Sequence, residues 1–340
     1  MYIVYLAYMP LQIVGGNRVI FEQVRELSKR KHRVEIWSEH CSGRSVFEPN
    51  VSIKKYNQAE LDIPDVVIAC DPGFIKPIKE FRKTGTSYLL LQHDFEWIIE
   101  QSRIPNGIEI FDELKNDVLT AGINILTVSK WLTSKIAEQF ELKPTLISNS
   151  VDTSLFKPSS PLINNLDGSI LAIYDPQEWK NFTYTTDIIA RLKFNHPRLK
   201  FMTISATLPS VEDVNLSYVD TWFINPRQDD LAKIYSSADI FLSTSLKEGF
   251  SLPGLEALAC ATSLVTTDNG GNRDYVKDGY NCVILDQFDI EGSVKKMEEL
   301  LDNHAVKKLL IKNGLDTVKN YLLINSIDAL ENTFLSTIKT

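Results

Sequence analysis

The sequence alternates regularly between short apolar runs and amphipathic helical patterns, and this alternation limits the fold more than any other feature. In the first half, helical patterns near 17–31, 72–84, 107–121 and 130–140 separate the apolar runs. The predicted strands there are Tyr2–Ala7, Arg33–Trp37, Val51–Lys55, Asp65–Ala69, Ser87–Leu91 and Asn124–Val128. Because two parallel strands need a long crossover between them, usually a helix, the pattern predicts a parallel, doubly wound sheet.

A segment rich in proline, serine and asparagine, Lys157–Gly168, interrupts the alternation as a linker would. The alternation then restarts with predicted strands at Ser169–Tyr174, Leu199–Ile204, Thr221–Ile224, Ile240–Ser243, Leu264–Thr267 and Val283–Leu285. The predicted helices of this half lie near 180–194, 229–237, 253–260, 289–302, 304–319 and 325–338.

The length of 340 residues suits two α/β domains better than one. We expect an α/β protein with two Rossmann-like domains that face across a cleft, the first over residues 1–155 and the second over residues 156–320. Helices close the chain at its C-terminus, and residues 321–340 are expected to pack back on the first domain. A cleft between two such sheets is a preferred place for a ligand.

The composition argues against several classes of function. The net charge of -8 does not favour binding to a phosphate backbone, so we expect no nucleic-acid partner. The four cysteines form no C-x-x-C pair and are expected to be reduced thiols, as in a cytoplasmic protein. The apolar start of the chain indicates a strand, and no apolar run reaches the roughly 18 residues needed to span a bilayer.

One basic run, Lys29–Arg33, stands out against the acidic balance of the chain. We interpret it as a solvated helix C-terminus, where positive charge complements the helix dipole. The alternative is a weak contact with a membrane surface, which would place the protein peripherally at the cytoplasmic membrane face. The five histidines are scattered along the chain, and we expect no metal site.

The strongest chemical signal is a pair of carboxylates at the two ends of the segment Glu248–Glu256 (EGFSLPGLE). Glu248 follows a predicted strand, and Glu256 lies in the first turn of the helix that Pro253 opens. The pattern places a carboxylate and a helix N-terminus, which can hold a phosphate, at the carboxyl edge of a parallel sheet. An ionised glutamate accepts two hydrogen bonds from vicinal hydroxyls, such as those of a ribose or hexose. For Glu256 alone, a glutamate that only complements the helix dipole is the simpler interpretation.

The segment from Ser237 to Asp286 resembles the donor-site signature of the retaining glycosyltransferases of family four, the glycosyl transferases group 1, which have the GT-B fold. The matching positions are Ala238-Asp239, Glu248-Gly249-Phe250, Leu252-Pro253, Leu255-Glu256-Ala257, Gly270-Gly271, Val276 and Asp278-Gly279. The resemblance implies that Glu248 touches hydroxyls of the donor sugar and that Glu256 holds the ribose of the donor nucleotide. It also implies that the intervening Phe250, Ser251 and Leu252 belong to the donor-binding site.

Weaker matches lie in the first domain. Gly15 and Gly16 follow the first predicted strand and precede a helix, where glycines let the backbone approach a phosphate or sugar. Two glycines after a strand are otherwise more often only a turn, but in the resembled family this loop lies under the donor phosphates and sugar. His93 stands at the end of the fifth predicted strand, where family members have a histidine that faces the reacting centre. An isolated histidine is otherwise usually structural.

One departure from the family concerns the clamp on the donor diphosphate. Family members have an arginine and then a lysine after the first strand of the second domain, and the two cations grip the diphosphate. Lys180 stands at the lysine position, whereas Tyr174-Asp175 occupies the neighbourhood of the arginine.

Two arginines are candidates to complete this clamp. Arg273, directly after Gly271-Asn272, is the first choice, and Arg227 is the second. The alternative for Arg273 is a surface ion pair with Asp274 or Asp278, which contributes little.

Taken together, these residues imply a glycosyltransferase of the hexosyltransferase type that moves a sugar from a nucleoside-diphosphate sugar to an acceptor, a glycan or a lipid-linked glycan, with retention of anomeric configuration. The expected catalytic residues are Glu248, His93 and Lys180. The expected donor-binding residues are Gly15, Gly16, Lys180, Glu256, Phe250, Ser251, Leu252 and Arg273. We expect no cofactor and no metal, because cations and a helix dipole can neutralise the leaving diphosphate.

Two other functions stay open at this point. The missing arginine favours a catalytically weakened GT-B-like binding or partner subunit, and a nucleotide-sugar epimerase could use the same fold. The paired glutamates argue against the epimerase. Acceptor contacts are expected from the first-domain loops Tyr8–Ile13, Cys41–Glu48 and Phe95–Gly107, which match no motif.

Overall fold

The computed structural model divides the chain into two compact units, residues 1–149 with 324–340 (unit 1) and residues 150–323 (unit 2). The residues that it describes are 1–8, 10, 15–40, 51–94, 107–163, 168–207, 209 and 216–338. The predicted acceptor loop 41–48, and most of loops 8–13 and 95–107, lie outside this part of the chain.

Unit 1 is built on a seven-stranded parallel sheet with the strand order β3-β2-β1-β4-β5-β6-β7. The strands are β1 (Tyr2–Leu6), β2 (Arg33–Ser38), β3 (Ile53–Lys55), β4 (Val66–Ala69), β5 (Thr86–Leu91), β6 (Asn124–Thr127) and β7 (Thr145–Leu146). The helices are α1 (Gly15–Lys29), α2 (Ile75–Phe81), α4 (Gly107–Thr120), α5 (Lys130–Phe140) and α11 (Leu323–Ile338).

Unit 2 repeats the same plan with a six-stranded parallel sheet of order β10-β9-β8-β11-β12-β13. The strands are β8 (Ser169–Tyr174), β9 (Lys200–Ser205), β10 (Thr221–Ile224), β11 (Ile240–Ser243), β12 (Ser263–Thr267) and β13 (Cys282–Leu285). The helices are α6 (Phe182–Asn195), α7 (Gln228–Tyr235), α8 (Leu252–Ala259), α9 (Ile290–Asp302) and α10 (His304–Val318). Short 3-10 turns at Glu178–Lys180 and Gly271–Asp274 follow β8 and β12.

The two parallel sheets confirm the predicted fold class of two Rossmann-like α/β units, and every strand predicted from the apolar runs is present. The two-residue strand β7 was not predicted, because a segment this short has no periodicity of its own. The helix starts agree with local capping chemistry. The Ser129 hydroxyl accepts a hydrogen bond from the Leu132 amide at the start of α5, and Asn303 does the same for α10.

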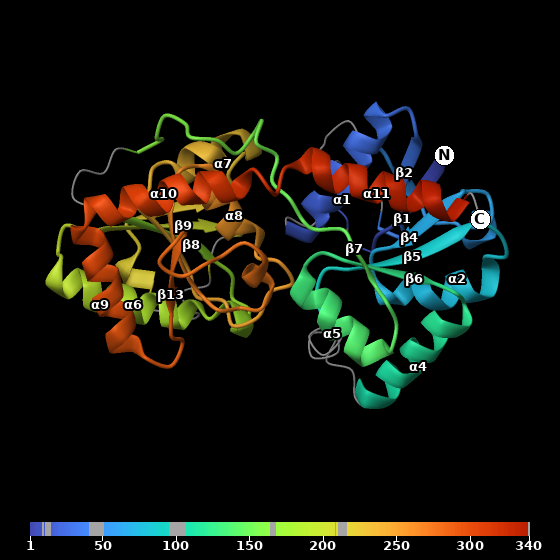
Figure 1. The fold of residues 1–340 in the computed structure, drawn as a ribbon, viewed down its shortest axis with the longest axis horizontal. Coiled ribbons are helices and arrows are strands. Elements are labelled where there is room, and N and C mark those ends of the chain that lie inside the picture. Colours follow the sequence, from blue (N-terminus) through green and yellow to red (C-terminus); the bar gives the residue numbers. More distant parts are fainter. Residues whose placement is uncertain are drawn as a thin grey trace. The chain divides into compact units, whose positions relative to one another are not determined.

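Helix α11, at the C-terminal end of the chain, packs in unit 1 (Figure 1). Its buried face consists of Ile327, Leu330 and Phe334, and the Phe334 ring lies 5.2 Å from the ring of Tyr88 on β5. The Tyr88 hydroxyl is hydrogen-bonded to that of Thr337 at 2.7 Å. The last helix therefore supplies part of the core of the first sheet.

The basic run after α1 contacts this same helix. Arg30 donates hydrogen bonds to Asp328, at 2.6 Å, and to Glu331, at 2.5 Å. The second oxygen of the Glu331 carboxylate lies 2.6 Å from Nε2 of His32. Hydrogen bonds from His32 and Arg30 lower the pKa of Glu331. Two of the basic side chains that were interpreted as a solvated helix end are thus engaged by α11. No helix in the described ranges is both long and apolar enough to cross a bilayer.

We expect Phe334→Ala to destabilise unit 1 by about 3–5 kcal/mol, because it leaves a cavity beside Tyr88. Leu335, the next residue, is 36% exposed whereas Phe334 is fully buried, so Leu335→Ala should change stability by less than about 1 kcal/mol. Native-state hydrogen exchange of the β5 amides in the full chain measures both. Equal effects of the two substitutions would contradict this packing of α11.

Candidate functional site

In the parallel sheet of unit 2, β9 and β10 lie on one side of β8, and the later strands, from β11 on, lie on its other side. The boundary between β8 and β11 is therefore the topological switch point of the sheet. In open α/β sheets, ligands bind outside the carboxyl ends of the strands at such a point. Lys180 lies in the turn that follows β8, and Glu248 lies in the loop that follows β11. The adjacent strand β12 leads into the loop that carries Arg273. Three of the predicted site residues therefore come from neighbouring strand ends.

Lys180 and Glu248 form the centre of this site. The Lys180 ammonium donates a hydrogen bond to Oε1 of Glu248 at 2.7 Å, although the two residues are 68 positions apart in the sequence. Burial lowers the pKa of Lys180, but attraction to the Glu248 carboxylate, the hydrogen bond to it and attraction to Asp175 together raise that pKa above its usual value. Lys180 is thus charged at neutral pH, and its ammonium keeps further N–H donors for a ligand.

Glu256 lies in α8 and is 3% exposed. One of its carboxylate oxygens accepts a hydrogen bond at 2.9 Å from the hydroxyl of Tyr235, which is itself buried at the end of α7. A buried tyrosine hydroxyl usually finds a polar partner, but nothing in the sequence indicates which one. Tyr235 is therefore a residue of the site that the sequence pattern missed.

The loops after β11 and β12 are joined by their backbones. The Glu248 amide donates to the Asn269 carbonyl at 2.9 Å, and the Gly271 amide donates to the Glu248 carbonyl at 3.1 Å. A Cβ on Gly271 would lie 2.3 Å from the carbonyl carbon of Gly249 and 2.4 Å from the amide nitrogen of Phe250. Only glycine allows this approach, so Gly271 fixes the distance between the two loops.

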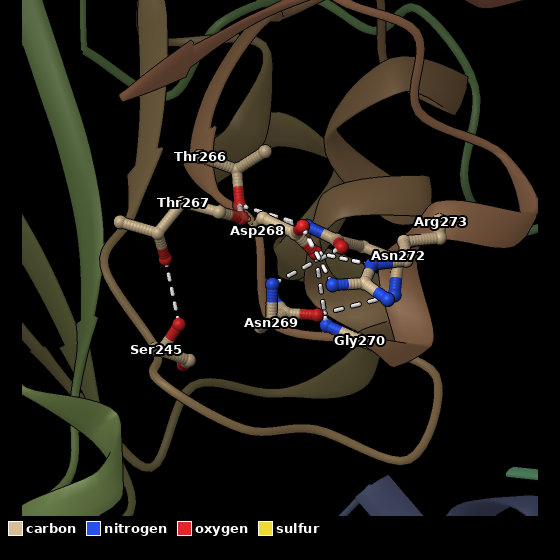
Figure 2. Close-up of polar contacts among 8 residues, drawn as sticks. All are labelled: Ser245, Thr266, Thr267, Asp268, Asn269, Gly270, Asn272 and Arg273. Atoms are coloured by element: carbon tan, nitrogen blue, oxygen red, sulfur yellow. Dashed lines mark hydrogen bonds and ion pairs between the residues drawn. The ribbon is translucent and has the colours of Figure 1, made fainter. Parts of the chain in front are cut away.

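Figure 2 shows how the side chains of the loop after β12 hold its shape. Asn269 and Asn272 bond reciprocally, each side-chain oxygen accepting from the backbone amide of the other residue. The Asn272 side chain also donates to the Thr267 carbonyl at 2.9 Å, and the Thr267 hydroxyl donates to the Ser245 carbonyl at 2.6 Å. These buried polar contacts hold the loop in one conformation.

Arg273 extends from this loop and forms a two-point ion pair with Asp268 (Figure 2). Its Nε and Nη2 donate to the two carboxylate oxygens at 2.7 and 2.8 Å. These hydrogen bonds lower the pKa of Asp268. The partner is thus Asp268 rather than Asp274 or Asp278, because the turn Gly271–Asp274 directs the guanidinium back along the loop.

The segment between the two glutamates carries backbone strain. Ser251, just before α8, has φ +67° and ψ +60°, the left-handed region that glycine adopts most readily. The Ser251 carbonyl accepts a hydrogen bond at 2.6 Å from the hydroxyl of the buried Tyr275. The ring of Phe250 lies 5.4 Å from that of Tyr275. Phe250, Ser251 and Leu252 are all buried, so in this structure they shape the site from beneath.

Tyr174 and Asp175 stand where the resembled family has its clamp arginine, and the structure shows what these two residues do instead. Tyr174 is buried in the core of unit 2, where its ring lies 5.0 Å from Phe182 and 5.7 Å from Trp222. Asp175 accepts a hydrogen bond from the Gln177 amide at 3.0 Å and adds a carboxylate near Lys180. Arg227, the second candidate, is 81% exposed and lies 3.5 Å from Asp229. Neither Tyr174 nor Asp175 replaces the family arginine.

In unit 1, the two glycines lie in the first turn of α1 rather than in a loop before the helix. The Gln92 side chain donates to the Gly16 carbonyl at 3.2 Å, and a Cβ on Gly16 would lie 2.6 Å from Oε1 of Gln92. His93, the next residue, follows the end of β5 and is half-buried. The start of α1 and the end of β5 are thus in contact, which brings Gly16 close to the segment that carries His93.

The described part of the chain contains no group of three or more His, Cys, Asp or Glu side chains placed to hold a metal ion. Lys180 and Arg273 lie at the unit 2 site in ion pairs with Glu248 and Asp268. Such a site can present an ammonium, carboxylates and a helix start to a phosphorylated, hydroxyl-rich ligand.

The comparison with known proteins agrees with this geometry. The family model described as Glycosyl transferases group 1 matches residues 215–317, which hold Glu248, Glu256 and Arg273. Within residues 215–317, this chain is therefore similar to the glycosyl transferases group 1. The matched range covers the strands β10 to β13 and the helices α7 to α9. The loops after β11 and β12, described above, lie within this range.

Two curated proteins that match this chain do so at low identity. An uncharacterised glycosyltransferase of Methanocaldococcus jannaschii is 24% identical over 58% of this chain and 55% of its own length. The MMP alpha-(1->4)-mannosyltransferase of Mycolicibacterium hassiacum is 25% identical over 60% of this chain and 51% of its own length. The chain spans about half the length of these curated relatives.

A solved structure similar to this one is that of Anabaena HepE in complex with UDP-glucose. It has a TM-score of 0.77 and 12% sequence identity, over 99% of this chain and all of that one. At this identity the likeness concerns the fold alone, and it confirms the expected GT-B fold over nearly the whole chain.

Gly271→Ala should destabilise unit 2 by about 2–3 kcal/mol, because the added methyl forces the backbone of Gly249–Phe250 to move. Gly279 is a matched control: it has φ +68° but open space around its Cβ, so Gly279→Ala should destabilise by only about 1 kcal/mol. Native-state hydrogen exchange at β11 and β12 measures both values. A loss for Gly271→Ala no larger than that for Gly279→Ala would contradict the close approach of the two loops.

Proposed function

We propose that this protein is a retaining glycosyltransferase that moves a hexose from a UDP-sugar to an acceptor hydroxyl. The observation that carries the proposal is the Lys180–Glu248 pair, together with Glu256, at the switch point of the unit 2 sheet. The match of residues 215–317 to the glycosyl transferases group 1 model supports it. The choice of UDP is supported by the HepE complex, whose ligand is UDP-glucose.

In the proposed reaction, the bond between the anomeric carbon and the donor diphosphate breaks, and a bond from that carbon to the acceptor oxygen forms on the same face. The acceptor proton passes to an oxygen of the leaving diphosphate. Lys180 stabilises the charge that develops on this leaving group. The backbone amides at the start of α8 add the positive end of a helix dipole. This chemistry needs no metal from the protein.

The two glutamates divide the donor between them in this proposal. Glu256 binds the ribose hydroxyls, and the Tyr235 hydrogen bond holds its carboxylate in place. Glu248 binds hydroxyls of the sugar, while its bond to Lys180 places the ammonium beside the diphosphate. Phe250, Ser251 and Leu252 form the floor of the donor site.

Unit 1 supplies the acceptor side of the reaction in this proposal. Gly15 and Gly16 present the start of α1 to the donor phosphates and sugar. His93 at the end of β5 faces the reacting centre, and a glycan or a lipid-linked glycan is the acceptor class. We also propose a cytoplasmic location, which the free thiols of Cys70, Cys260 and Cys282 support.

A second candidate function is a GT-B-like binding subunit with weakened catalysis. The observation that favours it is the charge balance around Lys180. Glu248 and Asp175 both lie near the ammonium, and Arg273 is neutralised by Asp268. Turnover of a UDP-sugar that increases with a glycan acceptor excludes this candidate, whereas UDP binding without turnover supports it.

Glu256→Gln should weaken UDP binding by about 1–3 kcal/mol, because it removes the charge that accepts the ribose hydrogen bonds. The amide oxygen of the glutamine can still accept from Tyr235, so the helix packing stays intact. Glu248→Gln should leave UDP affinity within about threefold and lower turnover, since its ligand is the sugar. Titration calorimetry with UDP tests both, with the exposed Glu291→Gln as control. Equal losses of affinity would refute the division of the donor between the glutamates.

Lys180→Met should reduce affinity for UDP about 10- to 100-fold and leave affinity for uridine unchanged, because the ammonium contacts only the phosphates. The double variant Lys180→Met/Glu248→Gln controls for the carboxylate that the single variant leaves unpaired. Arg273→Met should have a smaller effect on UDP, because Asp268 already neutralises this guanidinium. A large loss for Arg227→Met alone would move the second cation to Arg227.

A further inference from the structure

The chain passes from one unit to the other twice, after Asn149 and after Leu323. Residues next to these two points are hydrogen-bonded to each other through their backbones. Val151 and Leu322 form an isolated parallel bridge. The Val151 amide donates to the Tyr321 carbonyl at 2.9 Å, and the Leu323 amide donates to the Val151 carbonyl at 3.3 Å. We call Val151 and Tyr321–Leu323 the crossing pair. It lies within unit 2.

Tyr321 connects the crossing pair to both loops of the donor site. Its ring lies 6.0 Å from the ring of Phe250, in the loop after β11, with an interplanar angle of 61°. It lies 6.1 Å from the ring of Tyr275, after β12, at 71°. Its hydroxyl donates a hydrogen bond to the carbonyl of Asp274. One half-buried side chain therefore contacts both donor loops, while its own backbone carbonyl belongs to the crossing pair.

The contacted residues are those that set the geometry of the donor site. Phe250 is two residues from Glu248, and Tyr275 holds the strained Ser251 through its hydroxyl. Edge-to-face aromatic contacts have preferred angles, so a shift of one ring changes the favoured positions of the others. Packed aromatic rings couple two parts of a protein energetically only when those parts can change their arrangement.

We propose that Tyr321 is a positioning residue that couples the donor loops to the crossing pair. A change in the loop Glu248–Ser251, such as that made by a bound donor, then alters the stability of the Val151 and Leu323 hydrogen bonds. In the reverse direction, the crossing pair determines how the Glu248 loop is held. The part played by the donor rests on the proposed function, whereas the coupling itself can be measured without any ligand.

The ligand-free experiment measures hydrogen exchange of the Val151 and Leu323 amides in the full chain. Phe250→Leu and Tyr321→Leu should each speed exchange of both amides about fivefold relative to the Asn225 amide, which bonds to Ser205 elsewhere in unit 2. The double variant should exchange no faster than the faster single variant, since both substitutions remove the same Phe250–Tyr321 contact. Unchanged exchange in Phe250→Leu, or additive effects in the double variant, would overturn the proposal.

Tyr184→Phe is the matched control for the hydroxyl. The Tyr184 hydroxyl also donates to a backbone carbonyl, that of Asp286 at 2.7 Å. Tyr184 is not one of the three packed rings, which are those of Tyr321, Phe250 and Tyr275. Tyr321→Phe keeps the ring and removes only the bond to Asp274. We expect Tyr321→Phe to speed exchange at Val151 and Leu323 by about twofold, and Tyr184→Phe to leave it unchanged. Equal effects of the two variants would assign Tyr321 a merely structural role.

The ligand arm uses UDP as the probe. In the unmodified protein, saturating UDP should slow exchange at Val151 and Leu323, and Tyr321→Leu should bind UDP within about threefold without this protection. With a UDP-sugar, Tyr321→Leu should lower kcat more than it raises KM. If UDP does not bind but Phe250→Leu still changes exchange at the crossing pair, the proposed function fails and the coupling stands. If UDP binds and neither UDP nor Phe250→Leu affects the crossing pair, the coupling is wrong and the function stands.

Discussion

The candidate site depends on two backbone hydrogen bonds that join the loops after β11 and β12. The amide and carbonyl of Glu248 are bonded to Asn269 and Gly271, so the carboxylate starts from a fixed backbone. This pairing is available only because residue 271 has no side chain to hold the loops apart. A glutamate on a free loop would lose conformational entropy each time a ligand binds. Here the loop is already ordered when the chain folds, so ligand binding does not have to order it.

The second constraint on the site is electrostatic. Lys180 is paired with Glu248, and Arg273 is paired with Asp268, so both of these cations enter any binding event with a partner. A diphosphate must therefore share the Lys180 ammonium with Glu248 instead of meeting a free charge. An ammonium has three donors and can serve both. The pair thus orders the cation before the ligand arrives, at the expense of some of its attraction for phosphate.

Much of the fold could be predicted from the sequence, because it follows from short-range patterns. The alternation of apolar runs and helical periodicity gave the strands of both sheets in order, and β7 was missed because two residues carry no period. The packing of residues 321–340 on the first domain was expected, but the partners of α11 were not. Arg30 and Asp328 are 298 residues apart, and no local pattern relates them.

The sequence by itself determined the order of the elements, the spacing of Glu248 and Glu256, and the position of Lys180 after the first strand of unit 2, since these are properties of contiguous segments. Only the tertiary structure decided that Tyr235 holds Glu256, that Asp268 engages Arg273, and that Tyr321 contacts Phe250 and Tyr275. The physical reason is that a side chain's partner depends on which strand ends become neighbours. That choice is made by the packing of the whole sheet, where β8 lies beside β11, and not by the residues adjacent in the chain.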